Sequence, residues 1–172
     1  RGLMLEEMGD WASALREYQL ATQIAPHMAD AQYRRGVVLM HLERYEEALT
    51  AFGETLRLRP RLVPALINTG LTQEALGLPR EAIATFERAI SIDPKSAEAH
   101  LNLGALYGES GQMDSALDHC RKALAIDSQS SQAAFNAGLA LMERKPDEAA
   151  QFFRRAITLD PKNLGACHLL GS

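Results

Sequence analysis

The sequence predicts an all-α protein in which short antiparallel helix pairs stack one after another along the chain. Three observations support this class: small residues recur every 34 residues, apolar residues have helical spacing, and the composition is that of a folded chain. The 172 residues are 47% hydrophobic and 23% charged, close to globular averages, which argues against disorder. Aromatic residues make up only 6%, so we expect a core built mostly from Ala and Leu.

The internal period appears in five parallel series of residues, and such a period decides the fold of a repeat protein. Prolines mark one series: Pro26, Pro60, Pro94, Ser128 and Pro161. Glycines mark a second: Gly2, Gly36, Gly70, Gly104, Gly138 and Gly171. Three more series are Ala14, Ala48, Ala82, Ala116 and Ala149; Tyr18, Phe52, Phe86, Cys120 and Phe153; and Ala21, Ala89, Ala123 and Ala156. A one-residue deletion near residues 143–146 accounts for the single slip from 34 to 33.

Within one period, residues 97–109 and 114–126 each carry apolar residues at the spacing of an amphipathic helix. Gly111 ends the first of these helices. Gly104 lies inside the first helix, where glycine costs about 1 kcal/mol relative to alanine. We expect this cost to be offset because the second helix crosses there too closely for a side chain, with Ala116 as its small partner.

The phased spacing Gly-(11)-Ala-(3)-aromatic-(2)-Ala-(4)-Pro resembles the tetratricopeptide repeat (TPR), a 34-residue helix–turn–helix unit, over nearly the whole chain. The resemblance implies a right-handed α-solenoid superhelix, with the first helix of each repeat on the concave side and the second on the convex side. We expect one array over residues 1–172, without an internal domain boundary. It comprises a partial repeat at 1–28, full repeats at 29–62, 63–96, 97–130 and 131–163, and a partial repeat at 164–172. Because the chain does not begin with Met, we expect it to be a piece of a longer protein.

Several classes of function are disfavoured by composition and spacing. A net charge of −4 gives no electrostatic reason to bind nucleic acid, and the longest uncharged stretch, residues 128–142, is too short and polar to span a membrane. Cys120 and Cys167 lack the spacing of a disulfide framework or a zinc site. No motif of an enzyme is present, and no histidine has a partner at metal-ligand spacing. We therefore expect no catalytic residue, no metal and no cofactor, and place Cys120 and His100 in the core.

The resemblance implies that ligands bind to the inward-facing positions of the first helices. Position 6, counted from Ala29 as position 1, is Asn in three successive repeats. An amide both donates and accepts hydrogen bonds, so such a ladder could follow the backbone of an extended peptide beside an apolar wall. The candidate peptide-binding groove consists of Tyr33, Arg34, Val37, Ile67, Asn68, Leu71, Leu101, Asn102, Phe135, Asn136 and Leu139. It is similar to the asparagine ladder of O-linked N-acetylglucosamine transferase repeats. The alternative is that these asparagines bond their own neighbours in the stack.

Two other surfaces bear on function. Positions 2, 5 and 9 of the first helices lack the Lys and Asn residues with which chaperone-binding TPR proteins hold a C-terminal carboxylate, so chaperone tails are not expected ligands. A basic stripe on the second helices is more typical of a solvated face; it consists of Arg88, Arg121, Lys122, Arg154 and Arg155.

The sequence therefore predicts a cytoplasmic, non-enzymatic protein–protein interaction scaffold that binds an extended protein or peptide segment. Two alternatives remain open. One is self-assembly into a homo-oligomer through apolar residues of the terminal repeats, such as Leu164, Leu169 and Leu170. The other is a substrate-presenting arm of a larger enzyme such as a glycosyltransferase.

Overall fold

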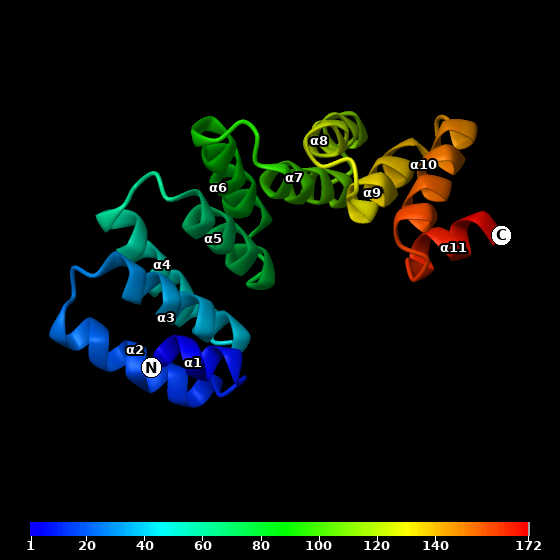
Figure 1. Cartoon of the computed structure of the whole chain (residues 1–172). Coiled ribbons are helices and arrows are strands. Elements are labelled where there is room, and N and C mark those ends of the chain that lie inside the picture. The colour runs from blue at the N-terminus through cyan, green and yellow to red at the C-terminus, as the bar shows by residue number, and fades with distance from the viewer. Residues whose placement is uncertain (172) are drawn as a thin grey trace. The chain divides into compact units, whose positions relative to one another are not determined.

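A computed structural model describes residues 1–171 and shows only helices among them (Figure 1). The helices are α1 (Gly2–Glu7), α2 (Trp11–Ile24), α3 (Ala29–His41), α4 (Tyr45–Leu58), α5 (Val63–Ala75), α6 (Pro79–Ile92), α7 (Ala97–Glu109), α8 (Met113–Ile126), α9 (Ser131–Leu141), α10 (Pro146–Leu159) and α11 (Leu164–Gly171). The predicted all-α class is confirmed. The helix expected over 97–109 is α7, and α8 begins one residue before the helix expected over 114–126.

The helices form two compact units, divided between Ile92 and Asp93. Turns of three or four residues join consecutive helices, so neighbours in each unit run antiparallel. In the first unit, α3 packs on α4, α4 on α5 and α5 on α6; in the second, α7 packs on α8, α8 on α9 and α9 on α10. The first helices of consecutive repeats also touch, α3 with α5 and α7 with α9. A single array over the whole chain stays a prediction.

In four of the turns that follow a first helix, one residue lies in the left-handed region. Gly9, Gly77 and Gly111 have φ angles of 72°, 72° and 75°, as expected for glycines that end helices. Their amides bond back into the helix, as in Gly77 N–H to Glu74 O at 2.9 Å. In the repeat at 29–62 the same place is held by Glu43, with a φ of 56°. This backbone conformation is therefore strained for Glu43, whereas it would be unstrained for glycine.

The glycines inside the first helices lie where the second helices cross, as predicted. A Cβ on Gly36 would lie 2.5 Å from the ring of Phe52. The same relation joins Gly70 to Phe86 and Gly138 to Phe153. The expected small partner, the alanine represented by Ala116, was incomplete: in these three repeats the nearest atoms belong to the aromatic side chain four residues after the alanine, whereas Ala116 itself does lie near Gly104. The reason is that the ring reaches across the helix interface and covers the glycine Cα.

The repeat at 97–130 departs from this arrangement because it has Cys120 in place of the aromatic residue. The Cys120 Sγ would lie 2.6 Å from a Cβ on Gly104, and the Ala116 carbonyl oxygen 3.3 Å from it. Cys120 is fully buried and His100 is 5% exposed, so both core assignments are confirmed. Burial in apolar surroundings raises the pKa of the Cys120 thiol to about 12.

Candidate functional site

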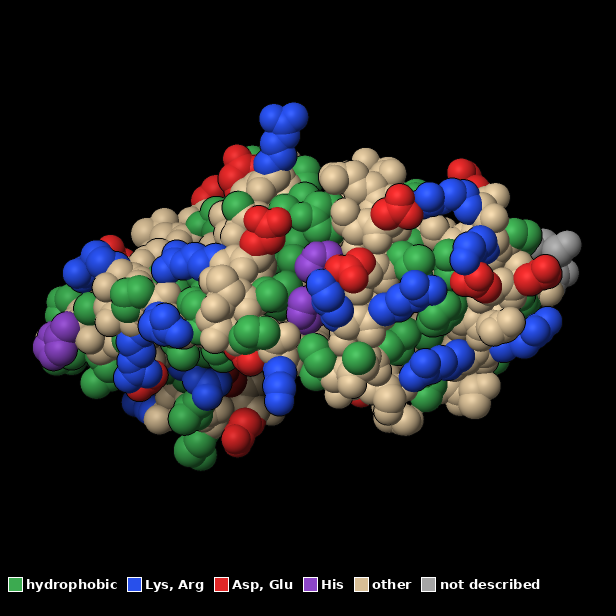
Figure 2. All heavy atoms as spheres, turned by 90° about the horizontal axis from the view of Figure 1, so that it is seen from above, with side chains coloured by type: hydrophobic (Ala, Val, Ile, Leu, Met, Phe, Trp, Pro, Cys, Tyr) green, Lys and Arg blue, Asp and Glu red, His purple; other side chains and the backbone are tan. Residues whose placement is uncertain are grey.

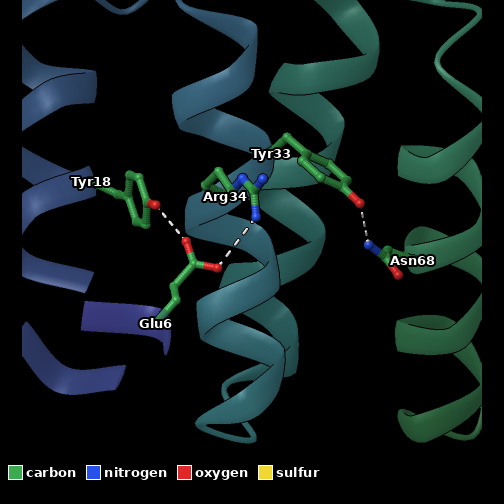
Figure 3. Close-up of polar contacts among 5 residues, drawn as sticks. All are labelled: Glu6, Tyr18, Tyr33, Arg34 and Asn68. Carbon is green, nitrogen blue, oxygen red and sulfur yellow. Dashed lines mark hydrogen bonds and ion pairs between the residues drawn. The ribbon is translucent and has the colours of Figure 1, made fainter. Parts of the chain in front are cut away.

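In the first unit, three predicted groove residues, Tyr33, Arg34 and Asn68, make polar contacts across the stack (Figure 3). Asn68 on α5 donates from Nδ2 to the Tyr33 hydroxyl on α3 at 3.0 Å. Arg34 on α3 lies 3.4 Å from Glu6 on α1, measured between Nη1 and Oε2. Tyr18 on α2 donates its hydroxyl proton to the same Glu6 carboxylate. Three repeats are thus linked through polar side chains of their first helices, joined by Tyr18 from α2.

These contacts occupy the groups that a ligand would need. For Asn68 the structure shows the alternative that the sequence left open, a bond to a neighbour in the stack. Burial, followed by the Glu6 carboxylate, raises the pKa of the Tyr18 hydroxyl, so Tyr18 remains a hydrogen-bond donor over the physiological range. Ile67 is 5% exposed and contributes to the core. Val37 and Tyr33 are half-buried and pack against the core of this unit.

In the second unit, the two position-6 asparagines are held much less firmly. Asn102 on α7 is half-buried, and its Nδ2 is buried without a hydrogen-bond partner among residues 1–171. Asn136 on α9 is also half-buried, and its Oδ1 accepts from Gln132 on the same helix at 3.0 Å. The Asn136 Nδ2 makes no hydrogen bond within the described part of the chain. The Asn136 amide therefore keeps a donor that a ligand backbone could use, whereas the Asn102 Nδ2 is shielded from solvent and meets a ligand only if its side chain rotates.

A pocket of about 780 Å³ lies between α7, α9 and the turns that follow them, within the usual size of a ligand site. Two predicted groove residues, Asn136 and Leu139, line it. Its other lining residues are Gly104, Ala105, Gly108, Glu109, Gly111, Gln112, Met113, Asp114, Ser115, Ala140, Met142, Glu143 and Arg144.

The pocket is hollow because α7 carries small residues where other repeats carry large ones. Ala105 stands at the position of Leu71 and Leu139, and Gly108 at the position of Met40 and Met142. Leu139 and Met142 on the opposite wall are 37% and 41% exposed. Apolar surface left open in this way is available for a partner side chain.

The turns add residues that sequence reasoning did not place in the site. Arg144 after α9 and Asp114 at the start of α8 pair across the pocket's end, with 2.6 Å between Nη2 and Oδ1. They are 30 residues apart, and no spacing rule brings them together. The small residues at 104, 105 and 108 could have indicated the pocket from the sequence, because they leave one face of α7 without large side chains.

The remaining candidates in the second unit contribute to packing. Leu101 and Phe135 pack against the core cluster of this unit. The Phe135 ring would lie 2.8 Å from a Cβ on Gly165, so α11 covers it. Leu169 and Leu170, proposed above for self-assembly, are half-buried against the same core, whereas Leu164 is 79% exposed. In the first unit Leu71 is half-buried.

The basic stripe is largely accounted for by contacts within each unit. Arg88 on α6 donates to the carbonyl of Pro60 at 2.8 Å, and Arg155 on α10 donates to the carbonyl of Ser128 at 3.0 Å. Each bond joins a second helix to the turn that ends the preceding repeat. The remaining pairs are Arg121 with Glu148 at 3.8 Å and Lys122 with Asp118 at 2.7 Å. Figure 2 shows Lys and Arg side chains interspersed with Asp, Glu and apolar side chains on the face that it displays.

One polar pair was not predicted from the sequence. His100 on α7 and His119 on α8 lie with their Nδ1 atoms 2.9 Å apart, although their spacing of 19 residues suggested no contact. Across residues 1–171 no group of three or more His, Cys, Asp and Glu side chains is arranged to hold a metal ion. Within the same residues, no helix is both long and apolar enough to cross a membrane.

Comparison with known families agrees with this architecture. Tetratricopeptide repeat models match residues 27–95, 97–130 and 132–163, and a TPR repeat model matches residues 80–111. The chain belongs to the tetratricopeptide repeat family. TPR proteins are generally non-enzymatic scaffolds, so the family supports a role in protein interaction. No curated protein matches the chain.

Solved TPR structures have the same fold at low sequence identity. YrrB, a TPR protein with an unusual peptide-binding site, is 24% identical; the match covers 99% of this chain and 89% of YrrB at a TM-score of 0.81. MamA from Desulfovibrio magneticus RS-1 is 23% identical, over 94% of this chain and 92% of MamA, at a TM-score of 0.83. PilW, a type IV pilus biogenesis factor, is 20% identical, over 99% of this chain and 86% of PilW, at a TM-score of 0.83.

Proposed function

We propose that this TPR protein is a scaffold that binds an extended peptide segment along the first helices of its repeats, α7 and α9 above all. The observation that carries the proposal is the state of Asn102 and Asn136. Both lie at position 6 of consecutive repeats, and both keep side-chain amide donors without acceptors among residues 1–171. The buried Asn102 donor costs about 1–3 kcal/mol while it lacks a partner, so a rotation of this side chain toward a ligand acceptor would recover free energy.

The acceptor that fits best is a peptide carbonyl. Two amides presented by successive repeats can each pair with the backbone of one extended chain, whatever its side chains. The pocket beside Asn136 then receives a side chain of the same peptide. YrrB, which shares the fold, is a TPR protein with a peptide-binding site, and this supports peptide as the class of ligand.

The proposal is tested with twelve-residue peptides selected from a randomised library against the purified chain. Calorimetric titration compares the wild type with Asn102→Ala/Asn136→Ala, using two selected peptides of unrelated sequence. We expect the double variant to bind both peptides at least about tenfold more weakly, since each lost hydrogen bond contributes about 1 kcal/mol. The loss is shared by both peptides because the contacts are made to backbone.

Gln151→Ala is the matched control, because Gln151 is an exposed amide on α10 outside the pocket. Far-UV circular dichroism checks that helical content is retained in both variants. Unchanged affinity in the double asparagine variant would show that the ladder does not hold the peptide.

A further inference from the structure

The pocket between α7 and α9 has a chemistry that selects among peptides. Its floor is apolar or small, formed by Ala105, Gly108 and Leu139, with Met142 beside them. Methionine and leucine side chains here are partly exposed, and methionine adapts its shape to an incoming group. An aliphatic side chain would therefore bury apolar surface on both itself and the pocket.

The pocket's lining is acidic. It carries three carboxylates, those of Glu109, Asp114 and Glu143, against the single guanidinium of Arg144. Asp114 and Arg144 neutralise each other through their ion pair. Glu109 and Glu143 are exposed and make no ion pair with any residue of 1–171. Two negative charges without an ion-pair partner thus lie at the end of α7 and in the turn after α9, beside an apolar hollow.

We infer that this pocket is a specificity site for a peptide that carries an aliphatic side chain next to a Lys or Arg residue. The aliphatic group occupies the hollow over Ala105 and Gly108, and the cation meets Glu109 and Glu143. Complementary charge determines which peptides the pocket accepts, and it fixes the register in which the peptide binds. This inference rests on the proposed function, which supplies the backbone contacts at Asn136.

The first test uses the same randomised twelve-residue library. Selection against the wild type is expected to enrich peptides with Lys or Arg within two residues of a Leu, Ile, Val or Met residue. Replacing that Lys or Arg by Glu in a selected peptide is expected to weaken binding about tenfold, through two partly screened charge contacts. The effect shrinks as salt is raised from 50 mM to 500 mM, because exposed charge pairs are screened.

The second test reverses the charge of the protein. Glu109→Lys/Glu143→Lys is expected to bind the Glu-substituted peptide more tightly than the original peptide, so the preference inverts. Asp147→Lys is the control, since Asp147 is an exposed acid on α10 that does not line the pocket, and it is expected to keep the original preference. Ala105→Leu fills the hollow with the residue found at the same position in α5 and α9, and is expected to weaken binding about tenfold.

The outcomes separate the two proposals. If no library peptide binds the wild type, both the groove and the pocket are wrong. If peptides bind through Asn102 and Asn136 but show no preference for a cation, or keep that preference in the double lysine variant, the pocket assignment alone is overturned.

Discussion

His100 and His119 face each other through their Nδ1 atoms at 2.9 Å, and the Nε2 of His100 lies 3.2 Å from the carbonyl oxygen of Pro94. A carbonyl only accepts, so His100 Nε2 carries a proton. In the neutral pair, His100 Nδ1 is then the acceptor and His119 Nδ1–H the donor. His119 also stacks on Tyr107, with ring centroids 5.6 Å apart. This pair fixes the start of α7 against α8.

His100→Phe is expected to lower the free energy of unfolding by about 2 kcal/mol. The phenyl ring fills much of the space, but the Pro94 carbonyl loses its donor and His119 loses this acceptor in a buried setting. Urea unfolding followed by circular dichroism measures the change. His168→Phe is the control, because His168 is exposed, and its effect should stay within about 0.5 kcal/mol. Equal stability of the two variants would show that the histidine pair contributes nothing.

Glu43→Gly is expected to raise stability by about 0.5–1 kcal/mol. Glu43 adopts the left-handed conformation that glycine adopts in three other repeats, and releasing this strain outweighs the extra freedom of glycine in the unfolded chain. The mirror experiment is Gly77→Ala, which introduces the same strain and should cost about 1 kcal/mol. Thermal unfolding should show a higher melting temperature for Glu43→Gly and a lower one for Gly77→Ala. A melting temperature lowered by Glu43→Gly would contradict the argument.

Gly36→Ala is expected to destabilise the chain by about 1–3 kcal/mol, because its Cβ would lie 2.5 Å from the ring of Phe52 and one of the two must shift. Gly53→Ala offers a matched comparison. Gly53 lies inside α4 with no atom within 4 Å of an added Cβ, so alanine should stabilise it by about 1 kcal/mol. Urea unfolding should give opposite signs, and two changes of the same sign would refute the crossing assignment.

Alkaline pH is expected to reduce stability through Cys120. Burial raises the pKa of its thiol from 9.0 to about 12 in the folded state. Below pH 9 the thiol is protonated in both the folded and the unfolded state, so its ionisation does not change the free energy of unfolding. Between pH 9 and 12 the unfolded chain ionises first, so stability falls by up to about 1.4 kcal/mol per pH unit. The slope between pH 9 and 10, measured by urea unfolding, should be shallower in Cys120→Ala than in the wild type. Equal slopes in the two proteins would argue against this titration.

Much of the helix pattern could be predicted from the sequence, because it depends on local spacing. The glycine series located the helix crossings, and Gly111 located a turn. The crossing partner was missed because periodicity gives the face of a residue such as Phe52 but not how far its ring reaches. The same limit applies to Asn68, whose bond to Tyr33 depends on side-chain directions in two helices.

The pocket was harder to predict for a different reason. It arises from side chains that α7 lacks at Ala105 and Gly108, and a hollow depends on whether neighbouring groups fill it. The pairing of Asp114 with Arg144 depends on turn conformation. Asn136 and Leu139 were found because they repeat at fixed positions, whereas the residues around them do not.

The bonds from Arg88 to Pro60 and from Arg155 to Ser128 join equivalent places, yet they span 28 and 27 residues respectively. The repeat that is one residue short has a first helix, α9, of 11 residues and a turn of four, against 13 and three in the repeat of α5, and Arg155 still reaches Ser128. The length of chain between the first and second helices of a repeat thus differs by one residue while the contact between a second helix and the preceding turn is kept. A short epitope tag or fluorophore-labelling sequence inserted after Arg144 would leave the stacking intact, whereas the same insertion beside Ser128 would separate the donor from its carbonyl.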